Sequence, residues 1–159
     1  MRVGLGFDIH KFGVERKLVL GGVVIPGHAG LVGHSDADVI SHSVADALLG
    51  ALGEGDIGQH FPNTDPQYKD ISSLILLDKV AKILKDKNYE VNNLDVMVAA
   101  QEPKLSPYYQ EMKENLVRAL DLDLGEINIK ATTTEGLGII GQGEGIACWS
   151  IVSIIRRQL

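Results

Sequence analysis

The chain has 159 residues, with 15 Lys plus Arg against 21 Asp plus Glu, and therefore a formal net charge of −6 at pH 7. A nucleic-acid binder needs clustered Lys and Arg to neutralise phosphates, and the sequence has no such cluster apart from Arg156-Arg157, so we expect no nucleic-acid partner. The composition, 45% hydrophobic and 23% charged, is that of an ordinary globular protein. A chain of this length can bury a sizeable core, and we expect one domain over residues 1–159.

The cysteine content and the N-terminus bear on the compartment. The lone cysteine, Cys148, can form no internal disulfide and no Cys-rich zinc site, which is typical of a reducing compartment. The first residues lack the continuous apolar stretch of a signal peptide, and no run approaches the ~18 apolar residues of a membrane span. The sequence therefore predicts a cytoplasmic protein with no membrane partner.

Hydrophobic periodicity predicts strands and helices in alternation. The predicted strands are residues 1–10, a hairpin over 17–26 that turns at Gly21-Gly22, 94–100, 127–133 and 145–156. The glycines at 27, 30 and 33 predict a loop after the hairpin. The predicted helices are residues 35–52, 71–87 and 106–120. Ser35 with Asp38 forms the capping box of the first helix, and Ser106-Pro107 provides an N-cap and a first-turn proline for the third.

The last predicted strand suggests how the fold is completed. Both of its alternating sets are apolar, with Cys148 and Val152 in one set and Trp149 and Ile151 in the other. A strand of this kind is buried on both faces. Three helices can cover one face of a small sheet, so the other face is expected to pack against another copy of the chain. We predict a single-domain α+β (mixed α/β) fold that oligomerises.

The first candidate site combines Asp8 and His10 with His42. Residues two apart on a strand share a face, so Asp8 and His10 can hold two corners of a metal site, and His42 on the first helix is the third. Three N/O ligands with an open fourth position are the pattern of catalytic zinc. Asp38 and Asp46, each four residues from His42, are candidates to orient its ring. The alternative is a group of polar residues at a solvated strand end.

The second candidate is the start of the first predicted helix. Exposed N–H groups at a helix N-terminus attract anions, and His34 and Ser35 can add donors to a bound phosphate. The simpler alternative is that Ser35 only caps the helix. The two roles are compatible.

The third and fourth candidates follow predicted strands. Thr132, Thr133 and Thr134 lead into Glu135, which offers hydroxyls for phosphate oxygens and one hard oxygen ligand for Mg²⁺, although threonines are also simply common in strands. Residues 99–106 combine small residues with a Pro-Lys turn that can admit a flat base, the alternative being a solvated connection.

A glycine motif at residues 136–141 must be set aside. It matches the dinucleotide-binding spacing G-x-G-x-x-G, but further glycines at 143 and 145 occupy the place where a helix should begin. The acidic residue expected about 20 positions later would fall at or beyond the last residue given. We therefore expect no nicotinamide cofactor and interpret the glycines as a tight loop.

Taken together, these motifs resemble the 2-C-methyl-D-erythritol 2,4-cyclodiphosphate synthase family over essentially the whole chain. The resemblance rests on segments in matching order and spacing. They are residues 6–10, 21–26, 34–38 with His42, 46–50, 55–58, 61–66, 130–135 and 141–147.

The resemblance implies a function for each candidate. The family cyclises 4-diphosphocytidyl-2-C-methyl-D-erythritol 2-phosphate with release of CMP, in non-mevalonate isoprenoid biosynthesis. It implies a homotrimer with active sites between subunits, Zn²⁺ on Asp8, His10 and His42, and a second divalent cation, Mg²⁺ or Mn²⁺, on Glu135. His34 and Thr133 are implied as transition-state stabilisers. The implied substrate-binding residues are Asp8, Ile9, His10, His34, Ser35, Asp56, Ile57, Gly58, Phe61, Pro62, Asn63, Thr64, Asp65, Ala100, Gln101, Glu102, Pro103, Lys104, Leu105, Ser106, Thr132, Thr133, Thr134, Glu135, Ile139 and Gln142.

Three positions depart from the family pattern. Asn63 stands where many members have Asp, Gln142 where some have Arg, and Ile139 where an aromatic residue is frequent. In the family the last two line the central cavity of the trimer.

Two other functions remain open from the residues alone. An open zinc position can activate water, which would make the protein a zinc-dependent phosphohydrolase. A trimeric module that binds metal or a small molecule without turnover is the second alternative, although it leaves the paired phosphate sites unexplained.

Overall fold

The computed structural model describes residues 1–157, without the side chains of residues 14 and 15. It contains a five-stranded sheet in the order β2-β1-β5-β3-β4. The strands are β1 (Arg2–Leu20), β2 (Val23–Leu31), β3 (Tyr89–Ala99), β4 (Ile127–Thr132) and β5 (Gly145–Arg156). The helices are α1 (Val39–Leu52), α2 (Ile57–His60), α3 (Ser73–Asp86), α4 (Tyr109–Leu120) and α5 (Gly138–Gly141).

Strand pairing confirms the predicted hairpin. β1 and β2 are antiparallel, and Leu20 lies opposite Val23 across the Gly21-Gly22 turn. Both turn glycines have positive φ, the backbone region that such a turn requires and that glycine adopts without steric cost. β5 is antiparallel to β1 and to β3, and β4 runs parallel to β3. β5 therefore occupies the centre of the sheet.

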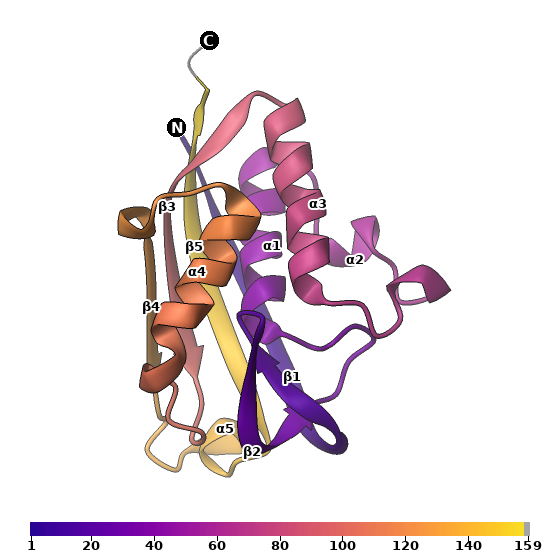
Figure 1. Cartoon of the computed structure of the whole chain (residues 1–159), viewed down its shortest axis with the longest axis vertical. Coiled ribbons are helices and arrows are strands. Elements are labelled where there is room, and N and C mark those ends of the chain that lie inside the picture. Colours follow the sequence, from indigo (N-terminus) through magenta and orange to yellow (C-terminus); the bar gives the residue numbers. More distant parts are fainter. Residues whose placement is uncertain (158–159) are drawn as a thin grey trace.

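The three long helices lie on the same side of the sheet, as Figure 1 shows. The main core forms between them and the sheet, with α1 contributing most of its length because eleven of its residues are buried. The predicted single-domain mixed α/β fold with three helices on one face is thus confirmed. None of the helices among residues 1–157 has the length and apolar character needed to cross a membrane.

The opposite face of the sheet carries large apolar side chains that the chain itself leaves open. Leu5 is 65% exposed and Ile151, its neighbour across the β1–β5 pair, is 52% exposed. Val3, Phe7 and Trp149 belong to the same outer face. β5 is therefore buried on one face only within a single chain, apart from the end where α5 places Ile140 against Ala147.

Three local expectations were wrong. The N-cap of α1 is Asp38, not Ser35, because Ala37 adopts a left-handed conformation (φ 59°) and the Asp38 carboxylate accepts hydrogen bonds from the N–H groups of Ile40 and Ser41. Gly27 and Gly30 belong to β2 rather than to a loop.

The third correction concerns Ser106-Pro107. It begins a short 3₁₀ turn, Ser106–Tyr108, and α4 starts only at Tyr109. The proline is still at the start of a helical segment, where its missing N–H costs no hydrogen bond.

Candidate active site

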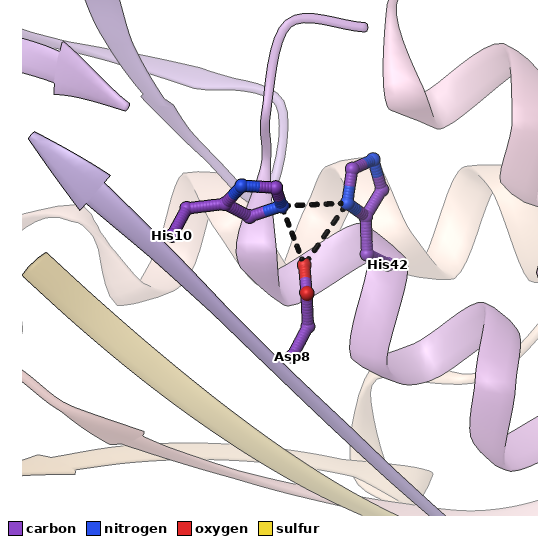
Figure 2. A group of neighbouring side chains, drawn as sticks. All are labelled: Asp8, His10 and His42. Carbon is purple, nitrogen blue, oxygen red and sulfur yellow. Dashed lines mark hydrogen bonds and ion pairs between the residues drawn. The ribbon is translucent and has the colours of Figure 1, made fainter. Parts of the chain in front are cut away.

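Asp8, His10 and His42 converge on one point between β1 and α1 (Figure 2). Asp8 Oδ2 lies 2.9 Å from His10 Nε2 and 3.0 Å from His42 Nδ1, and the two ring nitrogens are 3.3 Å apart. The sequence expectation that these three residues form one group is confirmed geometrically. All three are partly buried, so the group faces a recess and not open solvent.

The spacing of these atoms fits a bound zinc ion. Ligand atoms about 2.0–2.1 Å from a tetrahedral zinc lie roughly 3.3–3.4 Å from each other, close to the separations observed. The chemistry of the set fits as well, because two imidazoles and one carboxylate leave a fourth position for a substrate or water oxygen.

The remaining ring nitrogens of both histidines have partners. His10 Nδ1 donates to the carbonyl oxygen of Val32 at 2.7 Å, which leaves Nε2 as the lone-pair nitrogen in the neutral ring. His42 Nε2 lies 2.9 Å from the hydroxyl oxygens of both Ser35 and Ser73. Such contacts fix the orientation of metal-binding imidazoles.

The pKa values of the group reflect the mutual contacts. Burial raises the pKa of Asp8, but when the rings are protonated the N–H groups of His10 Nε2 and His42 Nδ1 and the two ring charges outweigh burial and hold that pKa well below its usual range. Burial lowers the pKa of His10, but the hydrogen bond and charge of Asp8 prevail and raise it. Asp8 is therefore a carboxylate at neutral pH, the form that binds a metal.

Asp38 and Asp46 do not orient His42, contrary to expectation. The buried Asp38 carboxylate accepts hydrogen bonds from the N–H groups of Gly21 and Gly22, both at 2.8 Å, as well as capping α1. Asp46 accepts from the N–H of Ile57 at 2.7 Å, which ties the start of α2 to α1. The sequence suggested a phosphate site at the N-terminus of α1, but the N–H groups of Ile40 and Ser41 there already donate to the Asp38 carboxylate.

The metal group opens into a pocket of about 220 Å³ that also includes several predicted substrate contacts. His34 lies there, and its ring nitrogen Nε2 is 3.2 Å from the carbonyl oxygen of Asp65. The predicted residues that line this pocket are Asp8, His10, His34, Ser35, His42, Ile57, Gly58, Phe61 and Asn63. Gly33, Tyr68 and Leu76 complete it, and the sequence did not indicate Tyr68 or Leu76. Ile9 lies on the opposite, outer face of β1 and is 39% exposed.

The remaining residues of the 56–65 loop hold its shape. Asp56 caps α2 by accepting from the N–H of Gln59, and Asp65 accepts from the N–H of Gln67. Pro62 and Thr64 belong to the same loop and are exposed.

A second pocket, of about 630 Å³, gathers the other predicted segment. Its predicted lining residues are Ala100, Gln101, Glu102, Pro103, Lys104, Leu105, Ser106, Thr132 and Thr133. His28 and Tyr109 also line it, and no pattern in the sequence connects them with this site. Residues 100–106 therefore lie beside Thr132 and Thr133.

Glu135 lies beyond this pocket, in the exposed loop after β4. Thr133 Oγ1 donates to Glu135 Oε1 at 2.9 Å, so the two residues are coupled. Glu135 has φ 54°, which turns its backbone at this point. Thr134 belongs to the same loop as Glu135. Ile139 is on α5 and is 54% exposed. Gln142 lines a third pocket together with Gln101 and Glu102.

The metal pocket and the second pocket share no lining residue. Strand register gives their separation: Asp8 is opposite Cys148, Cys148 is opposite Val98, and Val98 is opposite Ala131. Three steps between neighbouring strands amount to about 14 Å. Cys148 and Val98 are fully buried under the helices, so packed core fills that gap. One chain therefore does not join the two pockets into one site.

Fold and site together define a mixed α/β protein with a group of three side chains that could hold a metal ion and, apart from it, a second pocket. The family model described as the YgbB family matches residues 1–155. The chain belongs to the YgbB family.

Named relatives and solved structures are similar over nearly the whole chain. A 2-C-methyl-D-erythritol 2,4-cyclodiphosphate synthase of Desulforamulus reducens is 58% identical, covering 97% of this chain and 98% of that protein. The protein of the same name from Clostridium acetobutylicum is 56% identical, with 98% and 100% covered. The bifunctional IspDF of Campylobacter jejuni superposes with a TM-score of 0.95 at 46% identity, covering 99% of this chain and 42% of that one. IspF of Plasmodium falciparum in a CDP complex gives 0.87 at 38% identity, with 99% and 97% covered.

Proposed function

We propose that this protein is a CMP-releasing cyclase, which converts 4-diphosphocytidyl-2-C-methyl-D-erythritol 2-phosphate to 2-C-methyl-D-erythritol 2,4-cyclodiphosphate. The observation that carries the proposal is the convergence of Asp8, His10 and His42 within a pocket that also contains His34. Relatives more than 50% identical over nearly their full length carry the name of this synthase. A role in isoprenoid precursor biosynthesis in the cytoplasm follows from that proposal.

In the proposed site, Asp8, His10 and His42 would hold one Zn²⁺. When bound, that ion would supply Lewis-acid stabilisation of a phosphate oxygen and of the charge that develops during phosphoryl transfer. His34 lies in the same pocket and donates to a phosphate oxygen as that charge grows. The loop over residues 56–65 receives the ribose and the methylerythritol chain.

Glu135 is the proposed ligand of a second divalent cation, Mg²⁺ or Mn²⁺. Magnesium is bound in many enzymes through one or two carboxylates together with substrate phosphates and water, and one exposed glutamate suits that pattern. Thr133, whose hydroxyl contacts Glu135, is placed to donate to the diphosphate. Thr132 and residues 100–106 receive the cytidine part, with Lys104 beside its phosphate.

The reaction needs no protein nucleophile. The 2-phosphate oxygen attacks the β-phosphorus, the bond between that phosphorus and the bridging oxygen to the α-phosphate breaks, and CMP leaves with that oxygen. The residues of the two pockets align the nucleophile with the leaving group, and this positioning lowers the activation barrier of the reaction.

A homotrimer with its active sites between subunits would unite the two pockets. Within one chain, packed core separates them by about 14 Å. The exposed apolar face of β1 and β5 gives each chain a surface suited to a second copy. The pocket of one chain can then meet the metal centre of its neighbour.

A zinc-dependent phosphohydrolase is the alternative, because an open zinc position can also activate water. The two are separated by running the reaction in ¹⁸O-labelled water with the purified enzyme, Zn²⁺ and Mg²⁺. The proposed cyclase leaves both products free of solvent oxygen. Label in CMP or in an open-chain phosphate would identify a hydrolase. Stoichiometric zinc binding with no turnover would indicate the binding module.

A further inference from the structure

The side chain of Ser73 links a metal-binding histidine to a carboxylate that lies outside the metal group. Its hydroxyl oxygen is 2.9 Å from His42 Nε2 and also contacts Asp36 Oδ1. Ser73 is the first residue of α3 and is 1% exposed. Asp36 lies in the loop before α1, and its Oδ2 accepts a hydrogen bond from the backbone N–H of Ser73 at 3.1 Å.

Counting protons along this chain of contacts assigns their direction. An ionised carboxylate only accepts hydrogen bonds, so the Ser73 hydroxyl must donate its single proton to Asp36. Ser73 Oγ then has only lone pairs for His42, so a hydrogen bond between the two requires His42 Nε2 to be the donor. A neutral imidazole protonated on Nε2 presents its lone pair at Nδ1. Nδ1 is the nitrogen that faces Asp8 and His10, so Asp36 and Asp8 compete for the ring proton until a metal occupies Nδ1.

Ser35 fits the same direction. Its hydroxyl oxygen accepts from the N–H of Ala37 at 3.2 Å and lies 3.1 Å from Ser73 Oγ, to which it can donate. Ser35 Oγ is also 2.9 Å from His42 Nε2. It can accept from the same N–H group that donates to Ser73, so the ring needs no second proton. Every hydroxyl proton in the group thus has one acceptor, and Asp36 is where the chain of donors ends.

We infer that Asp36, acting through the hydroxyl of Ser73, is a positioning residue that holds His42 in the Nε2–H tautomer and thereby prepares Nδ1 to bind the metal. This inference rests on the proposed zinc site, whose ligand His42 it concerns. Both oxygens of Asp36 accept from the backbone, Oδ2 from the Ser73 N–H at the start of α3 and Oδ1 from the Asp38 N–H at 3.3 Å. Oδ1 also contacts the Ser73 hydroxyl, and the inference assigns that contact its function.

The test compares Ser73→Ala and Asp36→Asn with Ser72→Ala. Ser72 is the N-cap of α3 but makes no side-chain capping bond, so it is a matched control for loss of a hydroxyl at the same helix end. In the Asp36→Asn variant an amide NH₂ replaces one of the two acceptor oxygens with a donor, at unchanged shape. Zinc affinity is measured by titrating metal-free protein with Zn²⁺ against a chromophoric chelator. The His42 tautomer is measured by ¹⁵N NMR of histidine-labelled, metal-free protein in alkaline buffer, assigned with a His42→Gln variant.

We expect Ser73→Ala and Asp36→Asn to weaken zinc binding by about 10- to 100-fold, the range typical of contacts behind a metal ligand. Both should also populate the Nδ1–H tautomer, whereas Ser72→Ala should match the wild type in both readouts. Wild-type zinc affinity and an unchanged tautomer in Asp36→Asn would overturn the inference, and that variant decides the matter if Ser73→Ala fails to fold. If the wild type binds no zinc, the proposed metal centre fails, and the tautomer measurement still decides the role of Asp36.

Discussion

Gly6 of β1 lies so close to Ser43 of α1 that a β-carbon at position 6 would be 1.8 Å from the Ser43 carbonyl oxygen. Gly4 has the same relationship to Ala47, at 1.9 Å. These glycines and Asp8 are two residues apart along β1 and share its helix-facing side. The absence of side chains at 4 and 6 lets α1 rest on the strand backbone. Asp8 and His42 come into contact one step further along.

Substituting Gly6→Ala should push α1 away from β1. A real β-carbon cannot approach a backbone oxygen to 1.8 Å, and the atom it meets is backbone, which has little freedom to move. We expect a loss of about 2–3 kcal/mol in the free energy of unfolding, as for overpacked cores, together with weaker zinc binding. Chemical denaturation and zinc titration measure the two effects.

Gly50→Ala is the matched control, since Gly50 is on α1 and an added β-carbon would meet only the Leu5 carbonyl oxygen at 3.9 Å. It should stabilise the helix by about 0.5–1 kcal/mol. Equal stability and equal zinc affinity of Gly6→Ala and the wild type would contradict the account of the close approach.

Replacing Ile151 with Glu should prevent self-association. Ile151 is 52% exposed in the apolar outer face of the sheet, and a charge there would be desolvated by a second copy. Analytical ultracentrifugation should show a trimer for the wild type and a monomer for Ile151→Glu. Ile75→Glu is the control, because Ile75 is 49% exposed but lies on α3 at the helical side of the sheet. A trimer that survives Ile151→Glu would place the interface elsewhere.

The Asp38→Asn variant should be less stable by about 2 kcal/mol or more, because it breaks a buried set of hydrogen bonds. Asp38 Oδ2 accepts from the Gly22 N–H at 2.8 Å, and Oδ1 accepts from the Gly21 N–H at 2.8 Å, in a site with no solvent exposure. An amide would turn a donor toward one of these donors and leave a buried N–H without a partner. Thermal unfolding measures the change. Asp123→Asn, at a 3₁₀ N-cap without a side-chain bond, should leave the melting temperature unchanged; equal loss in both would refute the buried-cap explanation.

For Glu135→Gln we expect normal zinc content and a kcat lower by roughly 100-fold or more, because the proposed second cation supplies charge stabilisation of several kcal/mol. An amide binds Mg²⁺ far less well than a carboxylate does. Zinc analysis and steady-state kinetics over a range of Mg²⁺ concentrations separate the two ions. A variant with wild-type kcat and Mg²⁺ dependence would remove Glu135 from the metal chemistry.

Local patterns were sufficient to predict much of this fold. The last strand, residues 145–156, has the predicted bounds because a continuous apolar run flanked by glycine leaves few alternatives. The pairing of Asp8 with His10 followed from strand alternation alone. The start of α1 was misplaced because Ala37 takes a left-handed conformation and Asp38 serves two segments at once. Both features depend on contacts with the distant hairpin.

The candidate site shows the same limit. Asp8, His10 and His42 could be identified from residue type and spacing. Ser73, 31 residues after His42 in the sequence, could not, because only the packing of α3 against the loop before α1 brings its hydroxyl to the ring. His28 and Tyr109 could not be predicted either, because only the folding of the chain brings them to the second pocket.

The most direct test of the central claim is phosphorus NMR of the purified enzyme with Zn²⁺, Mg²⁺ and the cytidyl diphosphate substrate, run beside a His42→Ala variant. The account predicts that CMP and a cyclic diphosphate appear together at equal rates with the wild type. It predicts zinc-free, inactive trimers for His42→Ala. CMP accompanied by an open-chain phosphate, or turnover by a zinc-free His42→Ala variant, would contradict it.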